Sequence, residues 1–418
     1  MSQASLDSLF LNAVSSALQG NRVHWAPLSA ELWRNLFWLA EQQKLLPLLV
    51  DAVCECTGVE TDAGFLAARA TAKRQVLLQT QKDLAFRKVY RQLQDAGIDA
   101  LVVKGCLCRS VYPNGVLRIS ADEDLLVPED AFAQACQVLA EVGLVAAPGA
   151  AFENASEIGW RSPDGLLYLE LHKALFAPES LPFGLFQSFF SNVFSRSQTY
   201  PLDETAAVCS LSPHDHLLYL LLHAMKHFIH SGFGLRQICD VGLWAVRWED
   251  RIDWALLAQQ VQSVHAKAFC AALFEIAQQR LAISWNLPAC WRGLSPDPEP
   301  LLQDILDGGV YGSSTKSRQH TARITRDAVA AQLQGKRRRL RTAIFPPAKD
   351  LSSDYPVLKT HPSLLPLFWQ KRLAQYLLHA VGSKNDHPAE TLRLGKQRLA
   401  LLQTYGILEE ADPLSDPH

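Results

Sequence analysis

The sequence has few of the features that would tie it to a membrane or an oxidising compartment. Its 418 residues include only nine cysteines, and the pairs Cys54/Cys56 and Cys106/Cys108 are C-x-C, not C-x-x-C. An odd count at low density is typical of reduced thiols in a cytosol. The N-terminal segment lacks a basic stretch before an apolar core, and no uninterrupted apolar run reaches membrane-spanning length. We therefore expect a cytoplasmic protein with no membrane partner.

An excess of charge of one sign is also missing. The 40 Lys and Arg residues nearly balance the 42 Asp and Glu residues, which leaves a net charge of −2. The chain as a whole is therefore not attracted to nucleic acid, and any RNA contact requires a local patch. The one dense basic run contains Lys336, Arg337, Arg338 and Arg339. It could bind RNA or another polyanion, or it could be an exposed helix end or loop.

What the chain does contain predicts a globular protein of several packed units. Hydrophobic residues make up 48% of it and charged residues 20%, which is the composition of a folded domain. We expect a helical region over 1–95, a mixed strand and helix unit over 96–205, a helical bundle over 206–290, and an irregular and helical region over 291–418 with a mobile tail.

Helical periodicity and capping signals predict the scaffold. The expected helices are Leu6–Leu18, a helix capped by Ser29, a long helix from about Gly64 to Asp95, a leucine-rich helix starting near Ser212, a helix that holds Asp240, and a helix over Leu256–Leu281. Beyond Pro288 we expect irregular chain, then a helix over Leu367–Val381 and another from about Glu390 to Tyr405.

Two acids at alternate positions carry the first functional signal. An apolar run ends at Lys104-Gly105, and Arg118 precedes the pair Asp122 and Asp124. Alternate residues of a strand project to the same face, so the two carboxylates would lie side by side. They would repel each other unless a cation lay between them. A divalent cation that also binds phosphate is one reason to build such a pair, and a solvated acidic strand edge is the alternative.

A hairpin further along the chain supplies a third acid. Its arms are Glu157–Arg161 and Leu166–His172 around a Ser-Pro-Asp-Gly turn. In the second arm leucines alternate with Tyr168, Glu170 and His172. If this arm pairs with the acidic strand, Glu170 joins the two aspartates in a geometry suited to phosphoryl or nucleotidyl transfer. His172 would then either assist the acceptor or stabilise the hairpin.

Two histidines on the leucine-rich helix offer a different interpretation. His223 and His227 stand at i and i+4, a spacing that can chelate zinc. The segment lacks the glutamate of an H-E-x-x-H motif, and no third ligand is evident. A polar stripe that faces water or lines a cleft is the alternative.

Taken together, these motifs resemble one known family. The pattern of Lys104-Gly105, Arg118 and Asp122-x-Asp124 followed by Leu-Leu-Val is similar to the bacterial uncharacterised nucleotidyltransferase family of the DNA polymerase beta-like nucleotidyltransferase superfamily. Glu170-Leu-His, the histidine helix and the Asp240 helix extend the resemblance. With the proline-rich segment Phe345–Pro366 it spans roughly residues 30 to 380.

The resemblance implies an α+β fold, in which a small mixed sheet is flanked by N-terminal helices and a C-terminal helical bundle. It also implies Mg²⁺ or Mn²⁺ bound by Asp122, Asp124 and Glu170. Lys104 and Arg118 would neutralise the triphosphate of a nucleotide such as ATP, and backbone amides after Gly105 would cradle it.

The implied activity is transfer of a nucleoside monophosphate to an acceptor, with release of pyrophosphate. The acceptor would be RNA, a protein, a peptide or a small molecule, with His172, His223 and His227 on its side of the site, and an antitoxin or pathway partner is conceivable. Glu123 stands where the family has an apolar residue, which favours a second hypothesis, an inactive binding protein of the same fold. A metal hydrolase built on His223 and His227 is the third.

Overall fold

A computed structural model describes residues 3–148, 155–178, 182–230, 232–294, 296–308, 329, 357, 361–370 and 397–408. The α-helices are α1 Gln3–Leu18, α2 Ala30–Gln42, α3 Leu46–Val53, α4 Ala63–Asp95, α5 Cys106–Arg109, α6 Phe132–Glu141, α7 Pro213–His230, α8 Leu235–Arg247, α9 Trp254–Ser263, α10 Lys267–Arg280 and α11 Glu299–Gly308. The short 3₁₀ helices are η1 Val59–Thr61, η2 Gly115–Leu117, η3 Glu129–Ala131, η4 Phe183–Phe190, η5 Phe194–Arg196, η6 Glu249–Arg251, η7 Ala289–Trp291 and η9 Pro362–Leu364. The strands are β1 Leu101–Val102, β2 Glu123–Leu126, β3 Val145–Ala146, β4 Glu157–Arg161, β5 Tyr168–His172, β6 Gln198–Pro201 and β7 Ala207–Ser210.

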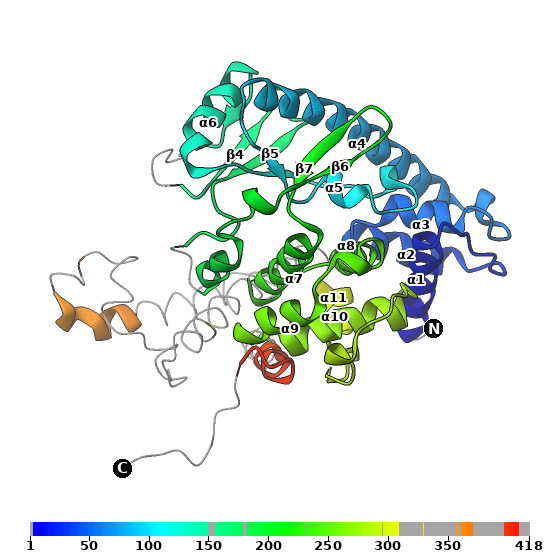
Figure 1. Cartoon of the computed structure of the whole chain (residues 1–418). Coiled ribbons are helices and arrows are strands. Elements are labelled where there is room, and N and C mark those ends of the chain that lie inside the picture. Colours follow the sequence, from blue (N-terminus) through cyan, green and yellow to red (C-terminus); the bar gives the residue numbers. More distant parts are fainter. Residues whose placement is uncertain are drawn as a thin grey trace, which may run out of the picture.

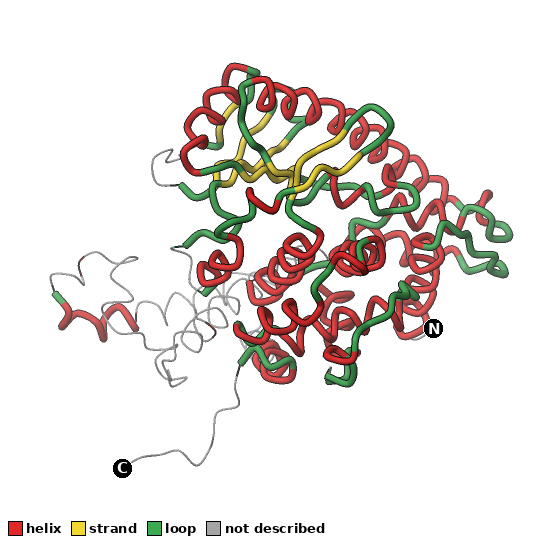
Figure 2. Tube along the Cα trace, in the orientation of Figure 1, coloured by secondary structure: helices red, strands yellow, loops and turns green. Residues whose placement is uncertain are grey.

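A small mixed sheet lies between two groups of helices. In the view of Figure 1, α4 and α6 lie above the sheet, the helices from α7 to α10 lie below it, and α1 to α3 lie at one end. Figure 2 shows the strands gathered in one part of a mostly helical chain. The expected α+β class, a small sheet flanked by helices, is confirmed.

The order of the strands decides which side chains can meet. The main sheet runs β1-β2-β5-β4-β3, and β6 and β7 form a separate hairpin. Strands β2 and β5 are parallel, with Asp124 opposite Glu170, whereas the other neighbours in the main sheet are antiparallel. The expected pairing of the acidic strand with the second hairpin arm is therefore confirmed.

Alternation along β2 and β5 places Asp124 and Glu170 on one face of the sheet and three leucines on the other. Leu125, Leu169 and Leu171 are fully buried. Asp124 and Glu170 project to the opposite face, toward α7. Because a parallel pair places equivalent residues side by side, this register brings one acid from each strand to the same spot.

Capping residues set several helix boundaries, including the predicted cap at Ser29. The Ser29 hydroxyl accepts a hydrogen bond from the Leu32 amide at the start of α2, and Asp62 caps α4 through the Phe65 amide. Gly97, with a φ of +74°, follows the end of α4, in the conformation that glycine adopts beyond a helix C-terminus.

Two expectations about the helical bundle are wrong. The single helix expected over Leu256–Leu281 is two helices, α9 and α10, because the chain turns at His265 with a φ of +56°. The chain after Pro288 is not wholly irregular, since α11 follows it. Its start is held by the Tyr405 hydroxyl, which accepts a hydrogen bond from the Leu301 amide at 3.1 Å.

Several expectations fall partly or wholly outside the described residues. These are the basic run with Lys336, Arg337, Arg338 and Arg339, most of the segment Phe345–Pro366, most of the helix expected over Leu367–Val381, the first part of the helix expected from about Glu390 to Tyr405, and most of the tail. Among the helices that the structure does describe, none combines the length and the apolar character needed to cross a lipid bilayer.

Candidate metal centre

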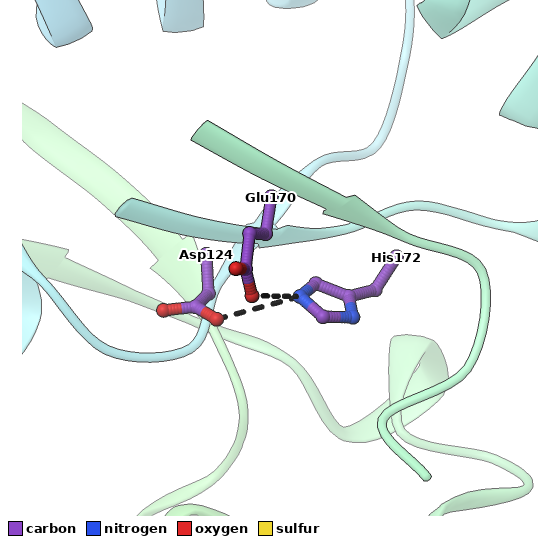
Figure 3. Close-up of side chains that lie close together, drawn as sticks. All are labelled: Asp124, Glu170 and His172. Carbon is purple, nitrogen blue, oxygen red and sulfur yellow. Dashed lines mark ion pairs between the residues drawn. The ribbon is translucent and has the colours of Figure 1, made fainter. Parts of the chain in front are cut away.

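Three side chains converge on the polar face where β2 and β5 lie together. Asp124, Glu170 and His172 each offer one ligand atom, and these atoms lie within 4.8 Å of one another. His172 Nε2 is 3.3 Å from Asp124 Oδ1 and 3.7 Å from Glu170 Oε2. Figure 3 shows both carboxylates pointing toward the same nitrogen of the imidazole. Among the described residues, this is the one such group of three that could hold a metal ion.

The two carboxylates of this group differ in their electrostatic environment. Burial disfavours the ionised form of Asp124, but the Lys104 ammonium and His172 outweigh it and lower the pKa to about 2. Burial and then the Asp124 charge raise the pKa of Glu170. When two acids share a site, the charge of the one that ionises first disfavours ionisation of the other and raises its pKa.

Lys104 supplies positive charge at the edge of this group. It follows β1, and its Nζ lies 3.1 Å from Asp124 Oδ2 and 3.2 Å from His223 Nε2. Burial lowers the pKa of Lys104, but Asp124 and the other nearby charges raise it well above its usual value. The ammonium is therefore charged at neutral pH.

The predicted pair of histidines on α7 lies next to the site, and one of them contacts Lys104. His223 Nε2 and His227 Nε2 are 3.2 Å apart, and both side chains are half-buried. Burial, followed by the charge of Lys104, lowers the pKa of His223 well below its usual value and that of His227 to about 3. Both imidazoles are thus neutral. They do not belong to any three-residue ligand group within the described chain, which leaves the zinc hydrolase hypothesis without a third ligand there.

Glu157 is a neighbour of the site that the sequence reasoning missed. Its Oε2 lies 3.4 Å from His172 Nδ1, because the β4–β5 register places Glu157 opposite His172. A carboxylate on the far nitrogen is the usual partner of a metal-binding imidazole, since it fixes which nitrogen faces the metal. Pairing the two hairpin arms residue by residue outward from the predicted turn would have placed Glu157 opposite His172.

The unsatisfied atoms of this group suit a cation. Asp124 Oδ2 and both ring nitrogens of His172 are buried and make no hydrogen bond, although charged groups surround them. They form ion pairs instead: Lys104 Nζ lies 3.1 Å from Asp124 Oδ2, and three carboxylates lie 3.3 to 3.7 Å from the His172 ring nitrogens. Two carboxylate oxygens and one imidazole nitrogen are a donor set that Mn²⁺ and Mg²⁺ accept, and the nitrogen favours Mn²⁺ of the two.

Asp122, the other predicted ligand, lies just before β2 and is half-buried. It is not part of the group that Asp124, Glu170 and His172 form. Its charge nevertheless acts on both Lys104 and Glu170, which places it near the edge of the site. His172, expected on the acceptor side, contacts both Asp124 and Glu170.

Arg118 is placed differently from the expectation. Its Nε and Nη2 donate to the two carboxylate oxygens of Asp240 at 2.9 and 2.6 Å, and the Tyr112 hydroxyl donates to the same carboxylate at 2.7 Å. Arg118 is 3% exposed and Asp240 is 4% exposed. Burial opposes ionisation of Asp240, and Arg118 outweighs it and lowers the pKa. This ion pair joins the loop before β2 to α8 and occupies the Nε and Nη2 donors of Arg118, while Nη1 lies 3.4 Å from the Gly105 carbonyl.

Glu123 is buried but fully paired, on the face of β2 opposite to Asp124. Its carboxylate accepts from the Cys106 amide at 2.8 Å, from Arg109 at 2.9 Å and from the Ser120 hydroxyl at 3.2 Å. The expected amide cradle after Gly105 therefore has its first donor already occupied by Glu123. A Cβ on Gly105 would lie 1.7 Å from Glu123 Oε2, so glycine is required there.

The loop before Asp122 is held by helices from both sides, a feature with no sequence signal. From α4, Lys82 Nζ donates to the carbonyls of Ser120 and Ala121 at 2.7 and 2.9 Å. From α8, Arg236 donates to the Ile119 carbonyl at 2.6 Å. These contacts fix the backbone from which the acidic strand starts.

One of the comparisons with known proteins finds a match. The model of the uncharacterised nucleotidyltransferase family matches residues 29–282, which include every residue of the site described above. No curated protein matches the chain. Since the match covers more than half of the sequence, the chain belongs to the uncharacterised nucleotidyltransferase family.

Proposed function

We propose that the chain is a nucleotidyltransferase that depends on Mn²⁺ or Mg²⁺ and moves a nucleoside monophosphate from a nucleoside triphosphate such as ATP to an acceptor, releasing pyrophosphate. The observation that carries this proposal is the convergence of Asp124, Glu170 and His172 beside the Lys104 ammonium, in a chain of this family. The polymerase beta-like superfamily and the acceptor (RNA, protein, peptide or small molecule) are part of the proposal.

The roles of the residues follow from their positions. Asp124, Glu170 and His172 would hold the cation, which supplies charge stabilisation for the phosphates and a lower pKa for a bound hydroxyl. Lys104 would counter the charge that develops on the leaving pyrophosphate. Glu170, whose side chain is 29% exposed, would orient the acceptor hydroxyl. Asp122, at the edge of the site, would join as a ligand when nucleotide is bound.

Glu123 no longer favours an inactive protein. Its charge is compensated by Arg109 and by hydrogen bonds on the face away from Asp124, so it leaves the acidic centre undisturbed. The nine free cysteines support the expected cytoplasmic location. RNA contact through the basic run and an antitoxin or pathway partner stay predictions.

A transfer assay tests the proposal. The protein is incubated with each α-labelled nucleoside triphosphate, Mg²⁺ or Mn²⁺, and a cell lysate divided into RNA, protein and small-molecule fractions. Label in one fraction that disappears with Asp124→Asn, but persists with the exposed control Asp130→Asn, is the expected result and identifies the acceptor class. No label with any nucleotide or fraction would contradict the proposal.

A further inference from the structure

The Lys104 ammonium lies between the Asp124 carboxylate and the His223 imidazole. Asp124 Oδ2, a proposed metal ligand, is 3.1 Å from its Nζ, and His223 Nε2 is 3.2 Å away. The contact with His223 has the geometry of a hydrogen bond, whereas the contact with Asp124 Oδ2 is an ion pair. The ammonium is thus directed to the imidazole while its charge still neutralises the carboxylate.

A divalent cation at Asp124 would bring two positive groups to one carboxylate. At a separation of a few ångströms such repulsion is large even in a well-screened site. The ammonium must then move away or bind less strongly to Asp124. His223 is the acceptor already in place on its other side, and it comes from α7, not from the sheet.

The neighbouring histidine makes His223 suited to this role. His227 Nε2 and Lys104 Nζ both lie 3.2 Å from His223 Nε2. The Lys104 ammonium can only donate, so His223 Nε2 is the acceptor and the His223 proton is assigned to Nδ1. With this tautomer, His227 Nε2 is the donor in its contact with His223 Nε2. Burial and the Lys104 charge, which lower the pKa of His223, keep this acceptor available at neutral pH.

We propose that the Lys104 ammonium and the divalent cation compete for Asp124, and that His223 is the positioning residue that holds Lys104 when the cation binds. This inference rests on the proposed function, because it takes Asp124 as a metal ligand. In this proposal, Lys104 neutralises Asp124 when no metal is bound and contacts phosphate when metal and nucleotide are bound.

The test is Mn²⁺ binding to the whole chain without nucleotide, measured by calorimetry and by the electron paramagnetic resonance signal of free Mn²⁺. Lys104→Met is expected to bind Mn²⁺ about ten-fold more tightly than the wild type, because the competing charge is gone. The matched control is Lys226→Met, which removes a charge from α7 near both histidines, and it is expected to change the affinity by less than about three-fold.

Two substitutions at His223 keep the proposal testable if Lys104→Met does not fold. His223→Ala removes the alternative acceptor and is expected to weaken Mn²⁺ binding several-fold, whereas His223→Gln retains an acceptor oxygen and is expected to restore it. Equal affinities for Lys104→Met and Lys226→Met, or no difference between His223→Ala and His223→Gln, would overturn the inference. If the wild type binds no Mn²⁺, or Asp124→Asn binds it equally well, the proposed metal site itself fails.

Discussion

The buried ion pair between Arg118 and Asp240 provides a decisive stability prediction. Replacing Arg118 with Met leaves the Asp240 carboxylate, which is 4% exposed, without its two strongest donors. Breaking one side of a buried pair costs about 3–5 kcal/mol of the free energy of unfolding. We expect a loss of that size in urea unfolding followed by tryptophan fluorescence, which is a large part of the stability of an ordinary domain.

A double-mutant cycle and a surface control isolate the pair. Arg118→Met with Asp240→Asn is expected to lose less than the sum of the single losses, by about 2–3 kcal/mol. Arg22→Met is the control, because Arg22 forms exposed ion pairs with a side chain that is 44% exposed, and such pairs contribute less than about 1 kcal/mol. If Arg118→Met left the stability unchanged but raised KM for the nucleotide, the reasoning would be refuted and Arg118 would be assigned to triphosphate binding.

Three further changes test other parts of the account. His216 is fully buried, and burial lowers its pKa from 6.5 to about 4. As the pH falls, His216 takes up a proton in the unfolded state before it does so in the folded state. The free energy of unfolding is therefore unaffected above pH 6.5 and falls by about 3 kcal/mol as the pH drops toward 4. This loss should be absent in unfolding measurements on His216→Gln. Gly105→Ala should displace Glu123 and reduce the free energy of unfolding by about 2 kcal/mol more than Gly58→Ala, because a Cβ at Gly58 meets nothing within 4 Å, and equal losses would contradict the contact. Glu157→Gln should weaken Mn²⁺ binding about ten-fold in calorimetry, and unchanged affinity would exclude a role for this carboxylate.

The centre of the site could be predicted because it depends on short-range patterns. Alternation placed Glu170 and His172 on one face of a strand, and the hairpin turn set the boundaries of both arms. Pairing that strand with β2 was the one long-range assumption, and the register confirms it by placing Asp124 opposite Glu170. The sequence therefore predicted Asp124 and Glu170 as acids on the same face and His172 as their neighbour.

What the sequence could not predict are partners chosen by packing. Arg118 and Asp240 are 122 positions apart. No local pattern distinguishes an arginine in a buried ion pair from one that contacts phosphate. Glu123 looked misplaced because its partner Arg109 comes from α5, and no local pattern pairs the two residues. The break between α9 and α10 depends on the left-handed φ of His265, a conformation that only a few per cent of non-glycine residues adopt.

The most direct test of the central claim is to locate the cation in a crystal grown with Mn²⁺ and a non-hydrolysable nucleoside triphosphate. An anomalous difference peak within bonding distance of Asp124, Glu170 and His172, with the α-phosphate beside it, is the predicted result. A peak at His223 and His227 with none at Asp124 would contradict the account and favour a metal hydrolase.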